Sequence, residues 1–108
     1  MSREKGGIYE EKGCKFLEER GFAILERNFY SRFGEIDIIA LKNKVLHFIE
    51  VKGSERGNPV YAITPKKLQK INKTILFYFC KNSAEFNYCI DALLICGDEI
   101  TLLENITI

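Results

Sequence analysis

The chain has 108 residues, of which 46% are hydrophobic, and its formal net charge is +1 at pH 7. This composition excludes a disordered chain and a uniformly basic one, and we expect a single domain, residues 1–108, that buries about 60–70% of its unfolded surface. The N-terminus has no apolar signal core, and the longest apolar run, Ile75 to Cys80, is too short to cross a membrane. We therefore expect a cytoplasmic protein with no membrane partner.

The four cysteines do not have the spacing of a common metal motif. They show no Cys-x-x-Cys pair, and they stand in apolar stretches. We interpret them as reduced, partly buried side chains and expect no zinc site from their spacing. They are Cys14, Cys80, Cys89 and Cys96.

The first predicted elements are a helix and a strand. Residues 8–20 carry apolar side chains at three- and four-residue spacing, and Gly21 can end the helix that they predict. Gly13 lies on the apolar face, which predicts that the helix packs closely against its neighbours. A strand is predicted over residues 22–29, and residues 30–33 are predicted to turn into the next strand.

A β-hairpin is predicted over the next segment. Residues 35–41 and 45–52 are rich in Ile, Val, Leu and Phe, and a short polar break separates them. Asn43 tolerates the positive φ of a tight turn. A two-residue loop at Asn43 and Lys44 would set the register of the two strands.

In this register, four charged side chains meet on one face of the hairpin. Asp37 lies opposite Glu50, and Glu35 lies opposite Lys52. Two opposed carboxylates repel each other by up to about 1 kcal/mol at a surface and by more when buried. A hard divalent cation such as Mg²⁺ or Mn²⁺ would offset that repulsion. The opposite face would carry Ile36, Ile38, Ile49 and Val51.

Lys52 would border such a metal site. There it could orient the attacking water and stabilise charge on a phosphate, which describes a metal-dependent phosphodiesterase. A simpler interpretation also fits these residues. Glu35 and Lys52 would form an exposed cross-strand ion pair, Asp37 and Glu50 would be solvated, and a one-residue shift in register would separate the group.

A second helix is predicted from Thr64 to Lys81, with Thr64 as the N-cap and a proline after it. The segment from Arg56 to Ala84 contains no acidic residue, so this helix is basic. Its lysines would either solubilise an exposed face or contact phosphates without sequence preference. They include Lys66, Lys67, Lys70 and Lys73, and the apolar stripe is Leu68, Ile71, Ile75 and Phe79.

The remaining segments complete the predicted sheet. Residues 53–59 are expected to form a mobile loop beside the site, residues 88–96 a buried strand, and residues 100–108 one or two edge strands. We expect Asp91 to make structural hydrogen bonds near the end of the sheet, and the open alternative is that it binds metal. His47, which would face Ala40, is interpreted as structural and not as a catalytic base.

The sequence Gly-Glu-Ile-Asp-Ile-Ile-Ala at residues 34–40, followed by Phe-Ile-Glu-Val-Lys at residues 48–52, resembles the signature of the bacterial YraN-type family. That family is placed in the restriction-endonuclease-like superfamily with the PD-(D/E)xK motif, which includes the archaeal Holliday-junction resolvases. The resemblance covers most of the chain. It implies an α/β, restriction-endonuclease-like fold with a mixed central sheet, flanking helices and the core order helix, three strands, helix, strand, which the periodicity also predicts.

The resemblance implies roles for individual residues. Asp37 and Glu50, with the Val51 carbonyl, would bind the metal ion, and Lys52 would be catalytic. Glu10 matches a glutamate of the family pattern, which stands three residues before a small residue, so it would join the metal site or the residues around its ligands, and we expect Glu10 and Glu35 to support the metal ligands. The open alternative is that Glu10 is a solvated helix residue, like its glutamate neighbours.

The resemblance extends to the basic residues, but the sequence differs from the family pattern at two positions. Lys67 matches a basic position of the family, and we expect Lys66, Lys70 and Arg32 to join it in binding nucleic acid. Tyr9 stands where the family usually has glycine. Tyr30 stands where arginine is usual, so that phosphate contact is either absent or made by Arg32. The family also has an aspartate at the position of Asp91.

We expect a Mg²⁺- or Mn²⁺-dependent nuclease-like protein that acts on the DNA backbone. Branched DNA as its substrate and a homodimer as its oligomeric state are implied only by the analogy with the resolvases. One alternative is a catalytically silent module on the same fold that binds nucleic acid or protein. A third interpretation is a structural assembly factor that binds no nucleic acid.

Overall fold

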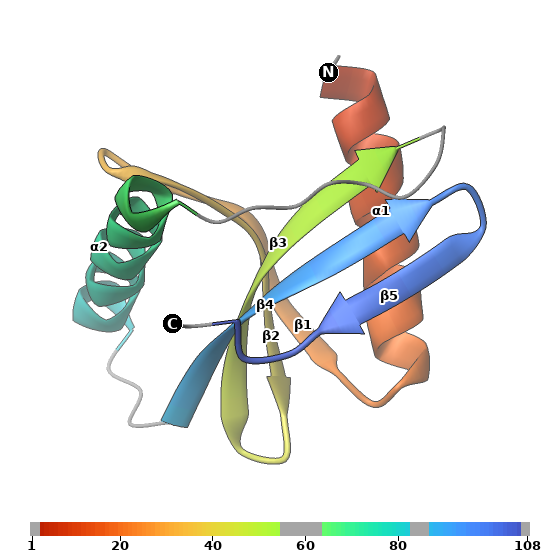
Figure 1. Cartoon of the computed structure of the whole chain (residues 1–108). Coiled ribbons are helices and arrows are strands. Elements are labelled where there is room, and N and C mark those ends of the chain that lie inside the picture. The colour runs from red at the N-terminus through yellow and green to blue at the C-terminus, as the bar shows by residue number, and fades with distance from the viewer. Residues whose placement is uncertain (1–2, 55–63, 83–86, 107–108) are drawn as a thin grey trace.

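The computed structural model of the chain describes residues 3–54, 64–82 and 87–106. The predicted core order of helix, three strands, helix and strand is confirmed, and a fifth strand follows it (Figure 1). The elements are α1 (Arg3–Glu19), β1 (Ala23–Ser31), β2 (Gly34–Lys42), β3 (Val45–Ser54), α2 (Pro65–Lys81), β4 (Asn87–Cys96) and β5 (Glu99–Leu103).

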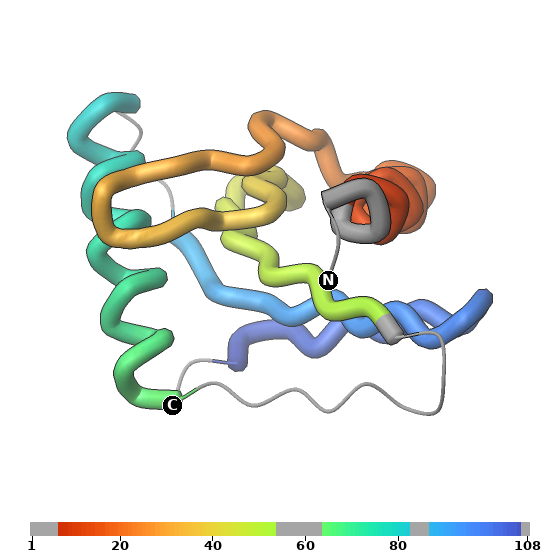
Figure 2. Tube along the Cα trace, turned by 90° about the horizontal axis from the view of Figure 1, so that it is seen from above, coloured from red at the N-terminus to blue at the C-terminus, as the bar shows by residue number. Residues whose placement is uncertain are grey.

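The strands form one mixed sheet in the order β1-β2-β3-β4-β5. The β1–β2, β2–β3 and β4–β5 pairs are antiparallel, whereas β3 and β4 are parallel. Parallel neighbours need a crossover connection, and α2 lies in the one that joins β3 to β4. Figure 2 shows the two helices on opposite sides of the sheet. The fold is thus α/β with a five-stranded mixed sheet and two helices.

Each helix covers its own apolar core. On the α1 side, Leu17 packs with the buried side chains of β2, β3 and β4. A Cβ added to Gly13 would lie 2.7 Å from Leu93 Cδ2, so α1 approaches the sheet to a distance that a larger residue would not allow. The predicted close packing at Gly13 is confirmed. On the α2 side, the buried residues include Phe29, Ile36, Ile39, Leu46, Phe48, Ile71, Ile75, Tyr78 and Ile90.

The β2–β3 hairpin has the predicted two-residue loop. Asn43 and Lys44 both have positive φ, 51° and 64°, as a type I′ turn requires. Pairing runs from Lys42–Val45 through Ala40–His47 to Ile38–Ile49, as predicted, and the antiparallel register stops there. The predicted backbone pairs Asp37–Glu50 and Glu35–Lys52 lie beyond that point and are not part of the register.

The prediction that Ile36 shares a face with Ile38 is wrong. Ile36 packs in the α2-side core, and Ile38 packs in the α1-side core. The pairs Arg27–Ile38 and Phe29–Ile36 place Asn28 across from Asp37, and Asn28 has a φ of 54°. The regular alternation of faces along β2 is therefore interrupted at Asp37, the residue between Ile36 and Ile38.

Several predicted boundaries move. The helix begins earlier, at Arg3, and β1 continues to Ser31, so the turn before β2 is only residues 32–33. β3 continues through Gly53 and Ser54, which pair with β4, so these two residues are strand rather than loop. The described residues do not include residues 55–59 of the predicted loop, among them Arg56, or residues 107–108. Between Ile100 and Ile106 there is one strand, β5.

The second helix matches its prediction closely. Thr64 is the N-cap, and its hydroxyl accepts a hydrogen bond from the Lys67 N–H at 3.1 Å, with Pro65 at the first helical position. The predicted apolar stripe faces the sheet: Ile71 and Ile75 are buried, and Leu68 and Phe79 are partly buried against them. Within residues 3–54, 64–82 and 87–106, no helix is long and apolar enough to cross a membrane.

Candidate metal centre

Three carboxylates converge where α1 meets β2. Glu10 comes from α1, and Glu35 and Asp37 come from β2. One carboxylate oxygen from each lies within 4.8 Å of those of the other two. Glu10 stands three residues before Gly13, so the close packing of α1 holds it over the sheet. The structure therefore brings together one helix residue and two hairpin residues that the sequence singled out.

Asp37 takes the place of a backbone partner at the end of the β2–β3 pairing. The Val51 N–H donates a hydrogen bond to Asp37 Oδ2 at 2.8 Å. Burial raises the pKa of Asp37 above its usual value, while the Val51 hydrogen bond and the charges of Lys67 and Lys52 oppose that rise. Asp37 is also hydrogen-bonded to the side chain of Glu35. Val51 is thus seen to hold Asp37 through its N–H, and metal binding by its carbonyl stays a prediction.

Glu50 lies beside Asp37 and is only 8% exposed. Burial is the main cause that raises its pKa to about 7, and the negative charge of Asp37 adds to the effect. Lys67 Nζ lies 3.9 Å from Glu50 Oε2. The sequence predicted Lys67 only as a phosphate contact, and this ion pair was not predicted. The sequence carries no signal for it, because Glu50 and Lys67 belong to different elements and are far apart along the chain.

Lys52 is exposed and borders the same group. It lies near enough to Asp37 and Glu50 for its positive charge to lower the pKa of both carboxyl groups. Asp37, Glu50 and Lys52 therefore lie beside one another, with Glu35 next to Asp37, and the roles expected of these residues stay predictions. This arrangement arises from side chains beyond the end of the pairing, and not from direct cross-strand pairs.

Glu10 is held by two residues of β1 that the sequence analysis did not single out. Its pKa is raised, first by burial, while a hydrogen bond with Asn28 and the charge of Arg27 oppose the rise. Arg27 lies 4.0 Å from Glu10 and 2.8 Å from Glu11. Glu10 is therefore not the fully solvated residue of the alternative interpretation. The sequence signal for Arg27 was weak, since a lone arginine in a strand has no pattern.

The predicted basic residues follow one edge of this centre. Lys67 contacts Glu50, and Lys70, one turn later, lies beside the start of β2, because a Cβ added to Gly34 would be 3.8 Å from Lys70 Cβ. The β1–β2 turn is held against α2 by a hydrogen bond of 2.9 Å between the hydroxyls of Ser31 and Thr74. This contact fixes where the turn residues lie.

Cationic groups also surround the turn between β1 and β2. The Arg32 guanidinium lies 4.9 Å from the centroid of the Phe33 ring, and Lys73 Nζ lies 5.5 Å from it. Both Arg32 and Lys66 are exposed. The structure thus places Arg32, Lys67, Lys70 and Lys73 around the same turn and the first half of α2, and Lys66 on the exposed surface of that helix.

The chemistry of these donors fits a hard divalent cation. All the candidate ligands are carboxylate oxygens, which suit Mg²⁺ and Mn²⁺ better than softer metals. The pKa values of Glu10, Asp37 and Glu50 are all raised, which means that the nearby cationic side chains do not fully compensate the buried negative charge. A bound cation would supply that compensation, so the residues present fit the predicted ion.

The fold and site define an α/β protein whose mixed sheet carries a carboxylate cluster, with buried Glu50 beside it, next to a basic helix. The chain belongs to the uncharacterised protein family UPF0102, whose model matches residues 9–95. A UPF0102 protein of Helicobacter pylori (strain Shi470) is 56% identical over 105 residues, covering 97% of this chain and 92% of the relative. Another, from Helicobacter hepaticus, is 54% identical over 107 residues, covering 99% and 97%. A third, from Wolinella succinogenes, is 48% identical over the full length of both chains.

Proposed function

We propose that the chain is a Mg²⁺- or Mn²⁺-dependent nuclease that hydrolyses the phosphodiester backbone of DNA. The observation that carries the proposal is the convergence of Glu10, Glu35 and Asp37, with buried Glu50 and exposed Lys52 beside them. When bound, the ion would polarise the scissile phosphate and lower the pKa of a bound water. Asp37 and Glu50 would hold it together with the Val51 carbonyl.

The protein residues around that ion have separate tasks. Lys52 would orient the attacking water and stabilise the charge that develops on the phosphate, because its ammonium group borders both metal-binding carboxylates. Glu35, one of whose carboxylate oxygens lies within 4.8 Å of one of Asp37, would support that ligand. Glu10 would do the same from α1, held in turn by Asn28 and Arg27.

The basic edge would bind the DNA strand. Lys66, Lys67, Lys70 and Arg32 would contact phosphates on either side of the scissile bond, and such contacts give affinity without sequence preference. The cationic side chains would place the backbone, while the carboxylate cluster performs the chemistry.

The resemblance to the restriction-endonuclease-like superfamily supports the same assignment. Asp37, Glu50 and Lys52 stand at the positions of its motif, and the observed core order agrees with that fold. Branched DNA as substrate and a homodimer as the active form follow from the analogy with the archaeal resolvases alone.

A catalytically silent binding module is the second candidate. The ion pair between Lys67 and Glu50 favours it, because a lysine close to a motif carboxylate can take the place of a metal ion and leave a purely structural group. Such a module would keep the basic edge and bind nucleic acid without cutting it.

A cleavage assay separates the two functions. The wild type is incubated with Mg²⁺ or Mn²⁺ and with single-stranded, duplex, flapped and four-way DNA, beside Glu50→Ala and Lys52→Ala. The nuclease predicts wild-type cutting that both substitutions abolish and that EDTA prevents. Binding that survives EDTA, with no cutting of any substrate, would instead establish the binding module.

A further inference from the structure

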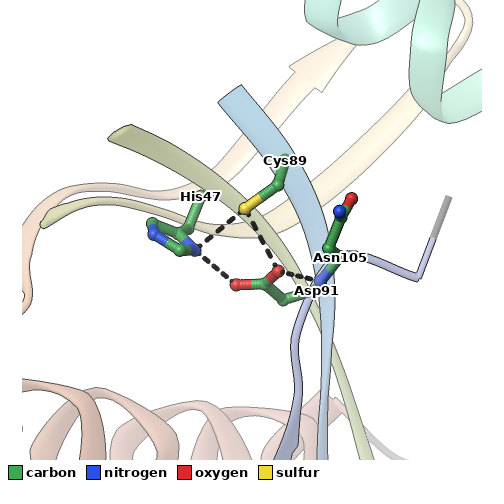
Figure 3. Close-up of polar contacts among 4 residues, drawn as sticks. All are labelled: His47, Cys89, Asp91 and Asn105. Carbon is green, nitrogen blue, oxygen red and sulfur yellow. Dashed lines mark hydrogen bonds and ion pairs between the residues drawn. The ribbon is translucent and has the colours of Figure 1, made fainter. Parts of the chain in front are cut away.

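A second group of metal-ligand side chains lies near the other end of β3. His47 comes from the beginning of β3, and Cys89 and Asp91 come from β4 (Figure 3). His47 is the register partner of Cys89, and Asp91 follows two residues later on the same face of β4. His47 is three residues from Glu50, which is about 10 Å along a strand. The group is therefore separate from the acidic centre.

The three side chains point at one another. His47 Nδ1 lies 2.5 Å from Asp91 Oδ2 and 3.1 Å from Cys89 Sγ. The Cys89 thiol donates to Asp91 Oδ1 at 3.3 Å. Asp91 is fully buried, and its Oδ1 also accepts a hydrogen bond from the Asn105 N–H at 2.8 Å. This confirms the prediction that Asp91 makes structural hydrogen bonds, and it shows a histidine, a cysteine and a carboxylate with their donor atoms turned inward.

One thiol sulfur, one imidazole nitrogen and one carboxylate oxygen form the ligand set of a borderline-soft metal ion. The acidic centre offers only oxygen. We propose that His47, Cys89 and Asp91 form a Zn²⁺ site, with a water molecule as the fourth ligand. The expectation that the cysteines bind no zinc rested on spacing along the sequence, whereas these ligands meet through the parallel pairing of β3 and β4.

The geometry needs only a small opening to accept the ion. Ligand atoms at about 2.0–2.3 Å from a tetrahedral zinc are roughly 3.3–3.6 Å apart. His47 Nδ1 lies 2.5 Å from Asp91 Oδ2 and 3.1 Å from Cys89 Sγ, so each of these two pairs must separate by less than about 1 Å. Cys89 is only partly buried, which leaves a side open for the water ligand. The edge of the Phe22 ring, with its centroid 4.9 Å from that of His47, limits rotation of the imidazole.

Zinc binding would displace the proton of the Cys89 thiol. Burial and the nearby charge of Asp91 raise the pKa of the Cys89 thiol to about 12, so without metal the sulfur keeps its proton. On binding, the thiol proton leaves to solvent, the sulfur bonds the metal as a thiolate, and the imidazole carries its proton on Nε2. The Asn105 N–H can stay on Asp91 Oδ1 and orient the carboxylate. The site would therefore join β3 and β4 to the segment after β5.

The first test uses Co²⁺ as a spectroscopic substitute for zinc. Metal-free protein titrated with Co²⁺ should develop a thiolate-to-cobalt charge-transfer band in the near ultraviolet, and Zn²⁺ should remove that band. Cys89→Ser should abolish the band, whereas Cys80→Ser, which changes an exposed cysteine of α2, should keep it. Asp37→Asn should also keep the band, so this test is independent of the acidic centre.

The second test measures stability and affinity. Zn²⁺ should raise the melting temperature of the wild type and of Cys80→Ser but not that of Cys89→Ser, and Zn²⁺ affinity should fall at least about tenfold in the latter. His47→Gln, which keeps a hydrogen-bonding group beside Asp91, provides the same comparison if the serine variant does not fold. A wild type that shows no cobalt band, or a band that survives Cys89→Ser, would overturn the zinc site and leave a hydrogen-bonded cluster.

Discussion

Replacing Glu50 by glutamine should stabilise the metal-free protein above neutral pH. Glu50 is 8% exposed, and its pKa rises from 4.5 to about 7, chiefly because of burial. Since one pKa unit corresponds to about 1.4 kcal/mol, keeping Glu50 ionised in the folded protein costs about 3 kcal/mol of folding free energy. Glutamine has nearly the same shape and never carries this charge.

The pH dependence has a definite sign. Between pH 4.5 and about pH 7 the folded protein holds the Glu50 proton while the unfolded chain releases it. The free energy of unfolding therefore decreases as pH rises through this window, and the full cost is present above about pH 7. The pKa of Asp37 is also raised, so Asp37 contributes in the same direction in both proteins.

Urea unfolding in EDTA measures the effect. Between about pH 4.5 and about pH 8 the wild type should lose about 3 kcal/mol more stability than Glu50→Gln, and at the higher pH the variant should be the more stable protein. Glu18→Gln, on the exposed face of α1, is the matched control and should behave like the wild type. A variant with the same pH dependence as the wild type, or with lower stability at about pH 8, would refute the assigned burial of Glu50.

Three further predictions concern the frame of the site and its basic edge. Gly53→Ala should destabilise the protein by about 1–3 kcal/mol in urea unfolding, because its Cβ would lie 2.3 Å from the ring of buried Tyr9; wild-type stability would show that the ring moves freely. Lys44→Gly should stabilise it by about 1 kcal/mol in the same assay, since Lys44 has a φ of 64°, and a loss of stability would contradict the turn assignment. Lys66→Ala should weaken DNA binding equally for unrelated sequences and reduce the salt dependence of log K by about 1, and an unchanged salt dependence would remove Lys66 from the DNA contacts.

The β2–β3 hairpin shows how far the sequence could predict the site. The β-prone runs and the polar break gave the loop and the register as far as Ile38–Ile49. The sequence carries no signal for the change at Asp37, whose carboxylate accepts a hydrogen bond from the Val51 N–H of another strand. A register extrapolated through this point correctly brought the charges together but placed Ile36 on the wrong face.

Long-range contacts account for the other differences. The N-cap Thr64 and the apolar stripe of α2 are local signals, so that helix was predicted nearly to the residue. The ion pair of Lys67 with Glu50 and the meeting of His47 with Cys89 depend on the crossover that makes β3 and β4 parallel neighbours. No periodicity encodes such a contact, since each partner looks ordinary within its own element.

The central claim is that the carboxylate cluster binds a divalent cation, and a calorimetric titration with Mn²⁺ tests it most directly. The wild type should bind the ion, Asp37→Asn should bind it at least about tenfold more weakly, and Glu18→Gln should match the wild type. If Asp37→Asn binds Mn²⁺ with wild-type affinity, the ion does not occupy this cluster and the proposed nuclease centre is contradicted.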